Sequence, residues 1–171
     1  WKLMATQGTA DGEGPIKPQR VAWELSQLAA DDAIVSTDSG TITTWVARHF
    51  KIRGTQKFSC SGNLATMAPG LPYAISAKLA YPDRQSIAFV GDGGFTMLMG
   101  EFLTAVKYNL PIVVVIIKNN TLGQIKWEQI VFLGNPEYGC ELQNCNFAKY
   151  AEACGGLGWT VERPEEIRPT L

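Results

Sequence analysis

The sequence predicts an α/β fold with three layers, α/β/α, around a mostly parallel sheet. Residues 87–90 and 112–117 are short apolar runs rich in β-branched side chains, a pattern typical of strands buried on both faces. Residues 95–109 between them carry an apolar stripe at helical spacing: Phe95, Leu98, Met99, Phe102, Leu103 and Val106. Strand, crossover helix and strand form a right-handed parallel unit. This central unit predicts the fold class.

The segments before the central unit alternate in the same way. Residues 19–30 are predicted to form a helix, because Val21, Leu25 and Leu28 share one face. Residues 33–37 form an apolar strand that ends at Asp38, and residues 58–60 a second, short strand. Between and after them we expect helices at 43–49 and at 71–81, the latter opened by an early proline.

The segments after the central unit are predicted to be more irregular. Residues 122–129 are compatible with a helix, 134–146 are polar and irregular, and 147–154 form a helix closed by Gly155. Residues 159–161 are predicted as a last strand, and 162–166 as the start of a final helix.

The domain organisation follows from length and from the Gly/Pro content. Residues 1–16 are interpreted as an interdomain linker, because residues 8–18 hold three glycines and two prolines. Residues 17–171 are long enough for one domain. The chain starts without an initiator methionine and stops in a predicted helical turn, so we expect a truncated fragment of a longer protein.

Composition and residue pattern argue against several classes of protein and of binding site. A net charge of -1 gives no basic footprint for nucleic acid, and no apolar run approaches the 18 residues of a membrane span. A cytoplasmic protein is expected, with reduced cysteines and Cys154 in the core. Cys140 and Cys145 lack the second pair that a zinc site needs. The only histidine, His49, is expected at an exposed helix end.

Two short motifs predict a ligand site at the sheet edge. Gly91-Asp92-Gly93 and Asn119-Asn120 each follow a predicted strand, with 25 residues from Gly94 to Lys118 between them. Open α/β sheets bind ligands at the carboxyl ends of their strands. A carboxylate and an amide oxygen suit Mg²⁺, and the free amides of Gly93 and Gly94 suit a phosphate group. A dinucleotide site is disfavoured, because Thr96 stands where the third glycine belongs.

At these residues the chain resembles the thiamine-diphosphate enzymes, whose shared motif is Gly-Asp-Gly, roughly 25 residues, then Asn-Asn. The resemblance covers about residues 17 to 168 and includes Asp38-Ser39-Gly40, residues 95–100 and residues 146–155. It is closest to the diphosphate-binding domain of pyruvate oxidases, the quinone-linked bacterial enzymes in particular. Residues 17–171 are therefore expected to adopt the thiamine-diphosphate-binding fold.

The resemblance also implies roles for single residues. Asp92, Asn120 and the backbone carbonyl of Leu122 would bind Mg²⁺, while Gly93 and Gly94 would hold the terminal phosphate. The other residues implied to bind the cofactor are Asp38, Ser39, Gly40, Thr41, Ala65, Thr66, Met67, Gly91 and Gly123. Met67 would wedge between the two rings of the cofactor, although ordinary core filling is the alternative for this residue.

The implied activity is the decarboxylation of a 2-oxo acid, with the activating glutamate supplied by another domain. The fragment alone would then be inactive. Pyruvate oxidase is preferred over acetolactate synthase, because Thr121-Leu122-Gly123-Gln124 lacks the acidic residues usual after Asn-Asn in the synthases. Two alternative functions remain: a non-catalytic cofactor-binding module, and an assembly domain that has lost its cofactor. The resemblance further implies a homodimer or homotetramer, and it allows FAD and a peripheral contact with the inner membrane in the full-length parent.

Overall fold

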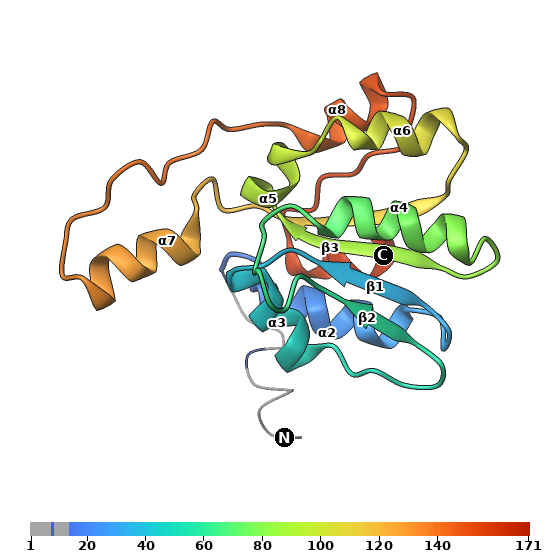
Figure 1. Cartoon of the computed structure of the whole chain (residues 1–171), viewed down its shortest axis with the longest axis horizontal. Coiled ribbons are helices and arrows are strands. Elements are labelled where there is room, and N and C mark those ends of the chain that lie inside the picture. Colours follow the sequence, from blue (N-terminus) through green and yellow to red (C-terminus); the bar gives the residue numbers. More distant parts are fainter. Residues whose placement is uncertain (1–7, 9–13) are drawn as a thin grey trace.

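The computed structural model describes residue 8 and residues 14–171, and it places four parallel strands in one sheet. The strand order is β2-β1-β3-β4, with β1 at Ile34–Thr37, β2 at Lys57–Ser59, β3 at Ser86–Gly91 and β4 at Ile112–Ile117. Helices cover both faces of the sheet (Figure 1). The predicted three-layer α/β/α fold is therefore confirmed. Most of the predicted linker, residues 1–16, lies outside the described residues.

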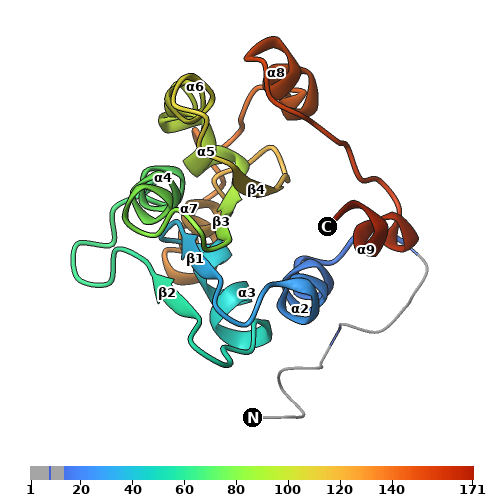
Figure 2. The same cartoon turned by 90° about the vertical axis from the view of Figure 1, so that its right-hand side faces the viewer.

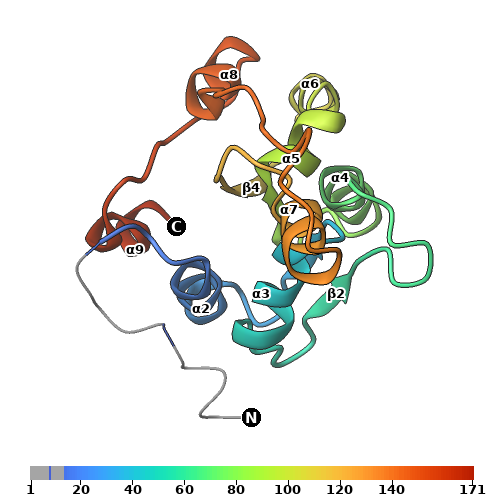
Figure 3. The same ribbon diagram turned by 90° about the vertical axis from the view of Figure 1, so that its left-hand side faces the viewer.

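The helices divide between the two faces of the sheet (Figures 2 and 3). On one face lie α2 (Pro18–Leu28) and α3 (Thr41–His49), with α9 (Ile167–Thr170) against α2. On the other lie α4 (Gly70–Ala80), α5 (Asp92–Met97) and α6 (Glu101–Lys107). The remaining helical segments are α7 (Gly123–Trp127), the π-helix η1 (Glu128–Phe132), α8 (Phe147–Ala153) and the 3₁₀ turn η2 (Pro164–Glu166).

The central strand β3 joins the two halves of the core. Ile87 and Phe89 pack into the cluster under α2 and α3, whereas Ala88 and Val90 pack into the cluster under α4 to α6. All four side chains are fully buried. Burying a side chain the size of Phe89 contributes about 2–3 kcal/mol relative to leaving it in water. The alternation along β3 thus fixes which face of the strand each helix layer covers.

The predicted helix at 95–109 is wrong as one element, because the structure divides it into α5 and α6. Leu98 leaves the helical region with φ -131°, and residues 98–100 form a turn. Gly100, the last residue of this turn, is a weak helix former. Leu98 and Leu103 of the predicted stripe are 43% and 51% exposed, so burial does not hold the stripe in one helix.

The predicted strand at 159–161 is also wrong, since these residues form no strand. Val161 instead packs against the core cluster under α2 and α3, while Trp159 is 67% exposed. Burying one side chain in this way needs no hydrogen-bonded ladder. The alternation of Trp159 and Val161 therefore reflects an irregular segment that packs Val161 against the core, and not a strand.

Two expectations about burial are wrong as well. His49 is buried, and its ring lies against that of Trp45 with the ring centroids 6.2 Å apart. Cys140 is the buried cysteine, whereas Cys154 is only partly buried, and all four cysteines are free thiols. Within the described part of the chain, no helix combines the length and the apolar character that crossing a membrane requires.

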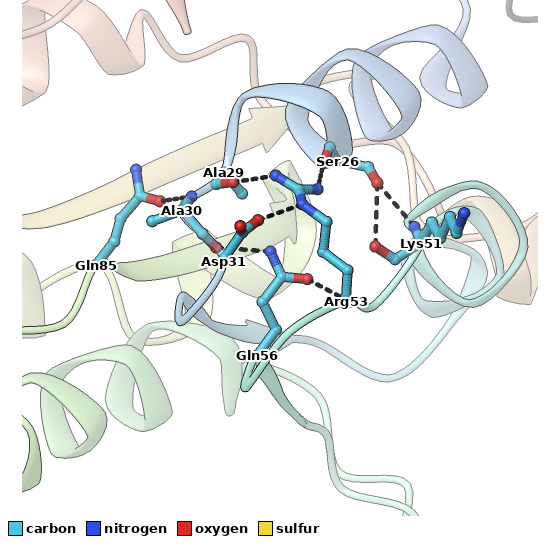
Figure 4. A network of polar contacts seen from close by, with 8 residues as sticks. All are labelled: Ser26, Ala29, Ala30, Asp31, Lys51, Arg53, Gln56 and Gln85. Carbon is cyan, nitrogen blue, oxygen red and sulfur yellow. Dashed lines mark hydrogen bonds and ion pairs between the residues drawn. The ribbon is translucent and has the colours of Figure 1, made fainter.

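A polar network ties helix α2 to the loop before β2 (Figure 4). The last turn of α2 has no basic residue of its own. Arg53 takes that place from a distant part of the chain, donating to the carbonyl oxygens of Ser26 and Ala29 and pairing with Asp31 at 2.6 Å. A guanidinium satisfies the free carbonyls at a helix end and opposes the negative end of its dipole. This network lies away from the sheet edge that carries the motif residues.

Replacing Arg53 with alanine is expected to destabilise the fold by about 2 kcal/mol, because charged hydrogen bonds to two carbonyl oxygens are lost. Urea denaturation of wild type and variant measures the difference. Arg163 is a matched control, since its ion-pair partners among the described residues are the nearby Glu165 and Glu166 and its side chain is 68% exposed. Arg163→Ala should leave the midpoint unchanged, and an equal loss in both variants would contradict a special role for Arg53.

Candidate functional site

The strand order creates one place where the sheet opens toward a ligand. From β1 the chain goes through α3 to β2, and from β3 it goes through α5 and α6 to β4, in the opposite direction. Such a switch point leaves a crevice outside the carboxyl ends of the two central strands. Asp38 follows β1 there, Asp92 follows β3 as the first residue of α5, and Asn119 and Asn120 follow the neighbouring strand β4. The topology therefore gathers the predicted motif residues at one edge.

Asp92 is the buried polar centre of this edge. It is 4% exposed, and one carboxylate oxygen, Oδ1, accepts from the amide of Gly93 at 3.0 Å. The other, Oδ2, accepts from the amides of Asn119 at 3.1 Å and Asn120 at 2.6 Å. The two motifs, predicted to meet on sequence grounds, are thus joined directly. The contact runs from the side chain of the first motif to the backbone of the second.

The backbone after β4 is shaped to face Asp92. Asn120 has φ +55°, a left-handed conformation that side-chain-bearing residues adopt rarely and that clusters at functional sites. Its carbonyl accepts from Leu142, and the amide of Leu122 donates to the carbonyl of Cys140, each bond 2.8–2.9 Å long. The Leu122 carbonyl accepts from Lys126 at 3.0 Å and keeps a second lone pair free for another partner.

Gly93 and Gly94 are held in tight contacts. A β-carbon on Gly93 would lie 2.7 Å from Cδ2 of Leu122, and one on Gly94 would lie 2.1 Å from Oδ2 of Asp38. Neither glycine can be replaced without moving its neighbour. The first turn of α5 therefore presents bare backbone, which lets another group approach its amides closely.

Asp38 is buried at 2% exposure beside this turn. Its Oδ1 accepts from the amide of Gly70 at 2.8 Å, while Oδ2 has no hydrogen-bond partner among the described residues. Burial raises the pKa of Asp38 from 3.8 to about 6, against the lowering effect of the Gly70 and Gly91 amides. The site thus holds a second buried carboxyl group in addition to Asp92.

The loop after Asp38 reaches the neighbouring segments. The hydroxyl of Ser39 donates to the carbonyl of Ser61 at 3.2 Å, and the hydroxyl of Thr41 lies 3.4 Å from the side-chain oxygen of Gln124. Gly40 precedes α3 with φ +114°. Gly123 begins α7, and a β-carbon on it would lie 3.2 Å from the side-chain nitrogen of Asn119. Ser39, Gly40, Thr41 and Gly123 are therefore brought to the same edge as Asp92.

Residues 65–67 lie in the exposed loop before α4. Ala65 has φ +48° and Ala68 has φ +66°, so the loop holds two strained residues, and the amide of Thr66 donates to the hydroxyl of Ser61 at 3.1 Å. Met67 is 37% exposed. Ordinary core filling therefore does not explain Met67, and its side chain remains available to a ligand.

The donor set decides which metal the site can hold. Among the residues described, no three His, Cys, Asp or Glu side chains gather as a metal cluster. The residues that the resemblance implies as ligands, Asp92, Asn120 and Leu122, offer oxygen atoms only: a carboxylate, a side-chain amide oxygen and a backbone carbonyl. That set is too small to enclose an ion alone, but it fits Mg²⁺, which is often bound by one or two carboxylates plus the phosphates of a ligand.

An arm extends beyond the site. We use this name for residues 121–141, which leave the sheet after Asn120 and return at an antiparallel bridge between Thr121 and Glu141. None of the residues in α7 or η1 is buried, and Figure 1 shows α7 standing away from the sheet. The exposed apolar side chains of the arm include Trp127, Ile130, Val131, Phe132 and Leu133. The arm is held by its own contacts, including the pairing of Lys126 with Glu137.

Sequence reasoning missed two residues that build the site. Gly70 donates to Asp38 and cannot carry a β-carbon, which would lie 2.5 Å from Val90. Ser61 joins the loops that carry Ser39 and Thr66. The only signal for Gly70 was its position in Pro69-Gly70-Leu71-Pro72, a common pattern at helix starts, and no local signal marked Ser61.

Comparison with known proteins gives a family for residues 38–171, described as "Thiamine pyrophosphate enzyme, C-terminal TPP binding domain". The chain is 53% identical over its whole length to "Putative thiamine pyrophosphate-containing protein YdaP" of Bacillus subtilis, covering 30% of that protein. It is 38% identical over 92% of its length to "Probable acetolactate synthase large subunit" of Methanococcus aeolicus, covering 27%. It is 36% identical over 98% of its length to "Pyruvate oxidase" of Lactiplantibacillus plantarum, covering 28%. The chain thus spans less than a third of each of these relatives.

Proposed function

Since the chain belongs to the thiamine pyrophosphate enzymes and matches their C-terminal cofactor-binding domain, we propose that it binds thiamine diphosphate with Mg²⁺ in a 2-oxo acid decarboxylating enzyme. The observation that carries the proposal is the contact of the buried Asp92 carboxylate with the amides of Asn119 and Asn120. This contact supports the proposal, because it holds a carboxylate, the kind of oxygen ligand that Mg²⁺ prefers, at the switch point of the sheet.

The residues divide the work of holding the metal and the diphosphate. Asp92, the Asn120 side chain and the Leu122 carbonyl bind Mg²⁺. The phosphate-binding turn, residues 91–94, offers the amides of Gly93 and Gly94 to the terminal phosphate. Ser39, Gly40 and Thr41 approach the diphosphate from the end of β1, and Gly123 from the start of α7. The residues of this chain therefore neutralise and orient the charged end of the cofactor.

The loop at residues 65–67 takes the other end of the cofactor. Residues 65–67 lie beneath its rings: the backbone of Ala65 and Met67 binds the aminopyrimidine edge, and the exposed side chain of Met67 lies against the rings. When bound, thiamine diphosphate supplies the nucleophilic carbon that adds to the carbonyl of a 2-oxo acid. Holding that carbon against the acid is a matter of positioning. The activating glutamate comes from another domain, so this part of the protein alone does not decarboxylate pyruvate.

We favour a pyruvate oxidase-type reaction over acetolactate synthesis. The arm begins with Thr121-Leu122-Gly123-Gln124 and thus lacks acidic residues directly after Asn120. Both activities occur among the named relatives, at 36% and 38% identity. In the full-length protein, FAD would then be a further cofactor and a 2-oxo acid would be the substrate of the enzyme. We expect the protein in the cytoplasm.

Isothermal titration of the full-length protein with thiamine diphosphate tests the proposal. We expect binding in the presence of Mg²⁺ and its loss with a chelator, because the diphosphate and the metal complete each other's coordination. Thiamine without phosphates is the matched control ligand and should bind far more weakly. Equal binding of both ligands, or binding that is independent of Mg²⁺, would contradict the proposed site.

We also propose that the arm packs against a second copy of the chain. Phe132 and Leu133 are 68% and 66% exposed, beside Trp127, and exposed apolar clusters of this kind mark contact surfaces. Cofactor sites in this family lie between two chains, which requires an interface near the carboxyl edge of the sheet.

The double change Phe132→Asp, Leu133→Asp is expected to shift the full-length protein toward a smaller assembly, because two buried charges would oppose the interface. Sedimentation velocity across a concentration series measures the shift. Leu79→Asp is the matched control, as Leu79 is 63% exposed on α4, outside the arm. An unchanged mass for the double variant would contradict an interface at the arm.

A further inference from the structure

Asp38 lies between the first residues of two helices. Its Oδ1 accepts from the amide of Gly70, the first residue of α4, at 2.8 Å. A neighbouring residue of β1, Ser36, donates its hydroxyl to the carbonyl of the same glycine at 2.7 Å. Both polar groups of the Gly70 backbone are thus bound by side chains from β1 and from the residue that follows it. The start of α4 is thereby fixed to the end of β1.

The other oxygen of Asp38 faces the phosphate-binding turn. A β-carbon on Gly94 would lie 2.1 Å from Oδ2 and 2.7 Å from Cγ of Asp38, so the carboxyl group occupies the space beside this glycine. Oδ2 is buried and has no hydrogen-bond partner among the described residues. Burying a polar atom in this way costs folding free energy. An alanine or a serine at position 38 would avoid much of this cost, which calls for another reason for a side chain of this shape and size.

The contact between Asp38 and Gly94 affects the proposed binding site, because Gly94 lies close to Asp92 in the sequence. Gly94 is the third residue of α5, two positions after Asp92, whose Oδ1 accepts from the intervening Gly93. Any shift of Gly94 toward β1 would carry Asp92 and the amides of the turn with it. Asp38 fills the space into which the turn would otherwise relax.

We infer that Asp38 is a positioning residue for the phosphate-binding turn: its carboxyl group links the starts of α4 and α5 and sets where Asp92 and the Gly93 and Gly94 amides stand. The inference rests on the proposed function. The resemblance implied that Asp38 binds the cofactor; in the inferred positioning role it touches neither the metal nor the phosphates. It acts through Gly94, and the shape of its side chain matters more than its charge.

A double-mutant cycle on the full-length protein tests this inference, with Mg²⁺-dependent binding of thiamine diphosphate as the readout. Gly94→Ala places a methyl group against the Asp38 carboxyl, and Asp38→Ser removes the support. Each change alone should weaken binding on the order of tenfold. Together, the methyl group fills the space that the carboxyl vacates, so the double variant should bind better than either single variant.

Two further variants separate positioning from general damage. Asp38→Asn keeps the acceptor for Gly70 and the shape beside Gly94, so it should bind nearly as tightly as wild type. Gly100→Ala is the matched glycine control, since a β-carbon there meets nothing within 4 Å, and Asp38→Ser should not change its effect. Thermal unfolding of every variant shows that the folded protein is being measured.

The outcomes are distinct. Additive effects of Gly94→Ala and Asp38→Ser, or a loss in Asp38→Asn as large as in Asp38→Ser, would overturn the positioning role while the wild type still binds. Absence of Mg²⁺-dependent binding in the wild type would overturn the proposed function itself, and the inference with it. Recovery in the double variant together with tight binding by Asp38→Asn supports the inference.

Discussion

Replacing Asp92 with alanine is expected to abolish Mg²⁺-dependent binding of thiamine diphosphate to the full-length protein. Asp92 supplies the only carboxylate of the proposed metal site, and its loss leaves neutral oxygens to hold a strongly hydrated cation. The same change removes the acceptor for the amides of Asn119 and Asn120, which are bound at 3.1 and 2.6 Å. Ligand and scaffold are therefore lost together, and the expected effect is large.

Calorimetry of wild type and variant measures the loss of binding. A second substitution at the same position separates the loss of the metal ligand from the loss of the contacts with the amides. Asp92→Asn keeps one of the two acceptor oxygens and removes the charge, so it should keep more of the fold's stability than Asp92→Ala while losing most of the Mg²⁺ affinity. Asp83→Ala, which removes an exposed carboxylate after α4, is the control and should bind normally. Unchanged affinity in Asp92→Ala would disprove the assignment of the metal ligand.

The architecture was predictable because the strands of a parallel sheet are apolar on both faces. Residues 87–90 and 112–117 show this directly, and the structure places them in β3 and β4. Helix limits were less predictable. The stripe from Phe95 to Val106 has helical spacing, but spacing alone does not reveal that Leu98 and Leu103 stay exposed. Without burial on that side, a turn ending at Gly100 competes successfully with a continuous helix.

The site was predictable as far as it depends on strand ends. Asp92 and Asn120 follow adjacent strands, and adjacent parallel strands end at the same edge. The contact itself was not predictable, since it joins the carboxylate to backbone amides rather than to the Asn120 side chain. Burial of single polar groups, as at Asp38 and His49, depends on which helix covers them. Such burial depends on how the helix and sheet layers pack together, and no local sequence pattern predicts it.

The buried carboxyl of Asp38 predicts how stability depends on pH. In the folded chain its pKa is raised to about 6, whereas 3.8 is the ordinary value expected after unfolding. Between these values the folded state keeps a proton that the unfolded state releases. The contribution of Asp38 to stability therefore falls as pH rises from about 4 to about 6, and its penalty is fully present above that window. Its size is about 3 kcal/mol, from the free energy that corresponds to such a shift.

Asp38→Asn is expected to remove this dependence, because the amide does not ionise and still accepts from Gly70. Urea denaturation from pH 4 to pH 8 should give similar stabilities for wild type and variant at the acid end and a more stable variant at pH 7 to 8. Asp83→Asn, at an exposed position, is the control and should follow the wild type throughout. Parallel pH profiles for wild type and Asp38→Asn would show that Asp38 ionises at its ordinary pKa and that its burial carries no such cost. A stabilised Asp38→Asn that still binds thiamine diphosphate would show instead that the shape of this side chain, without its charge, is sufficient to support the turn at Gly94.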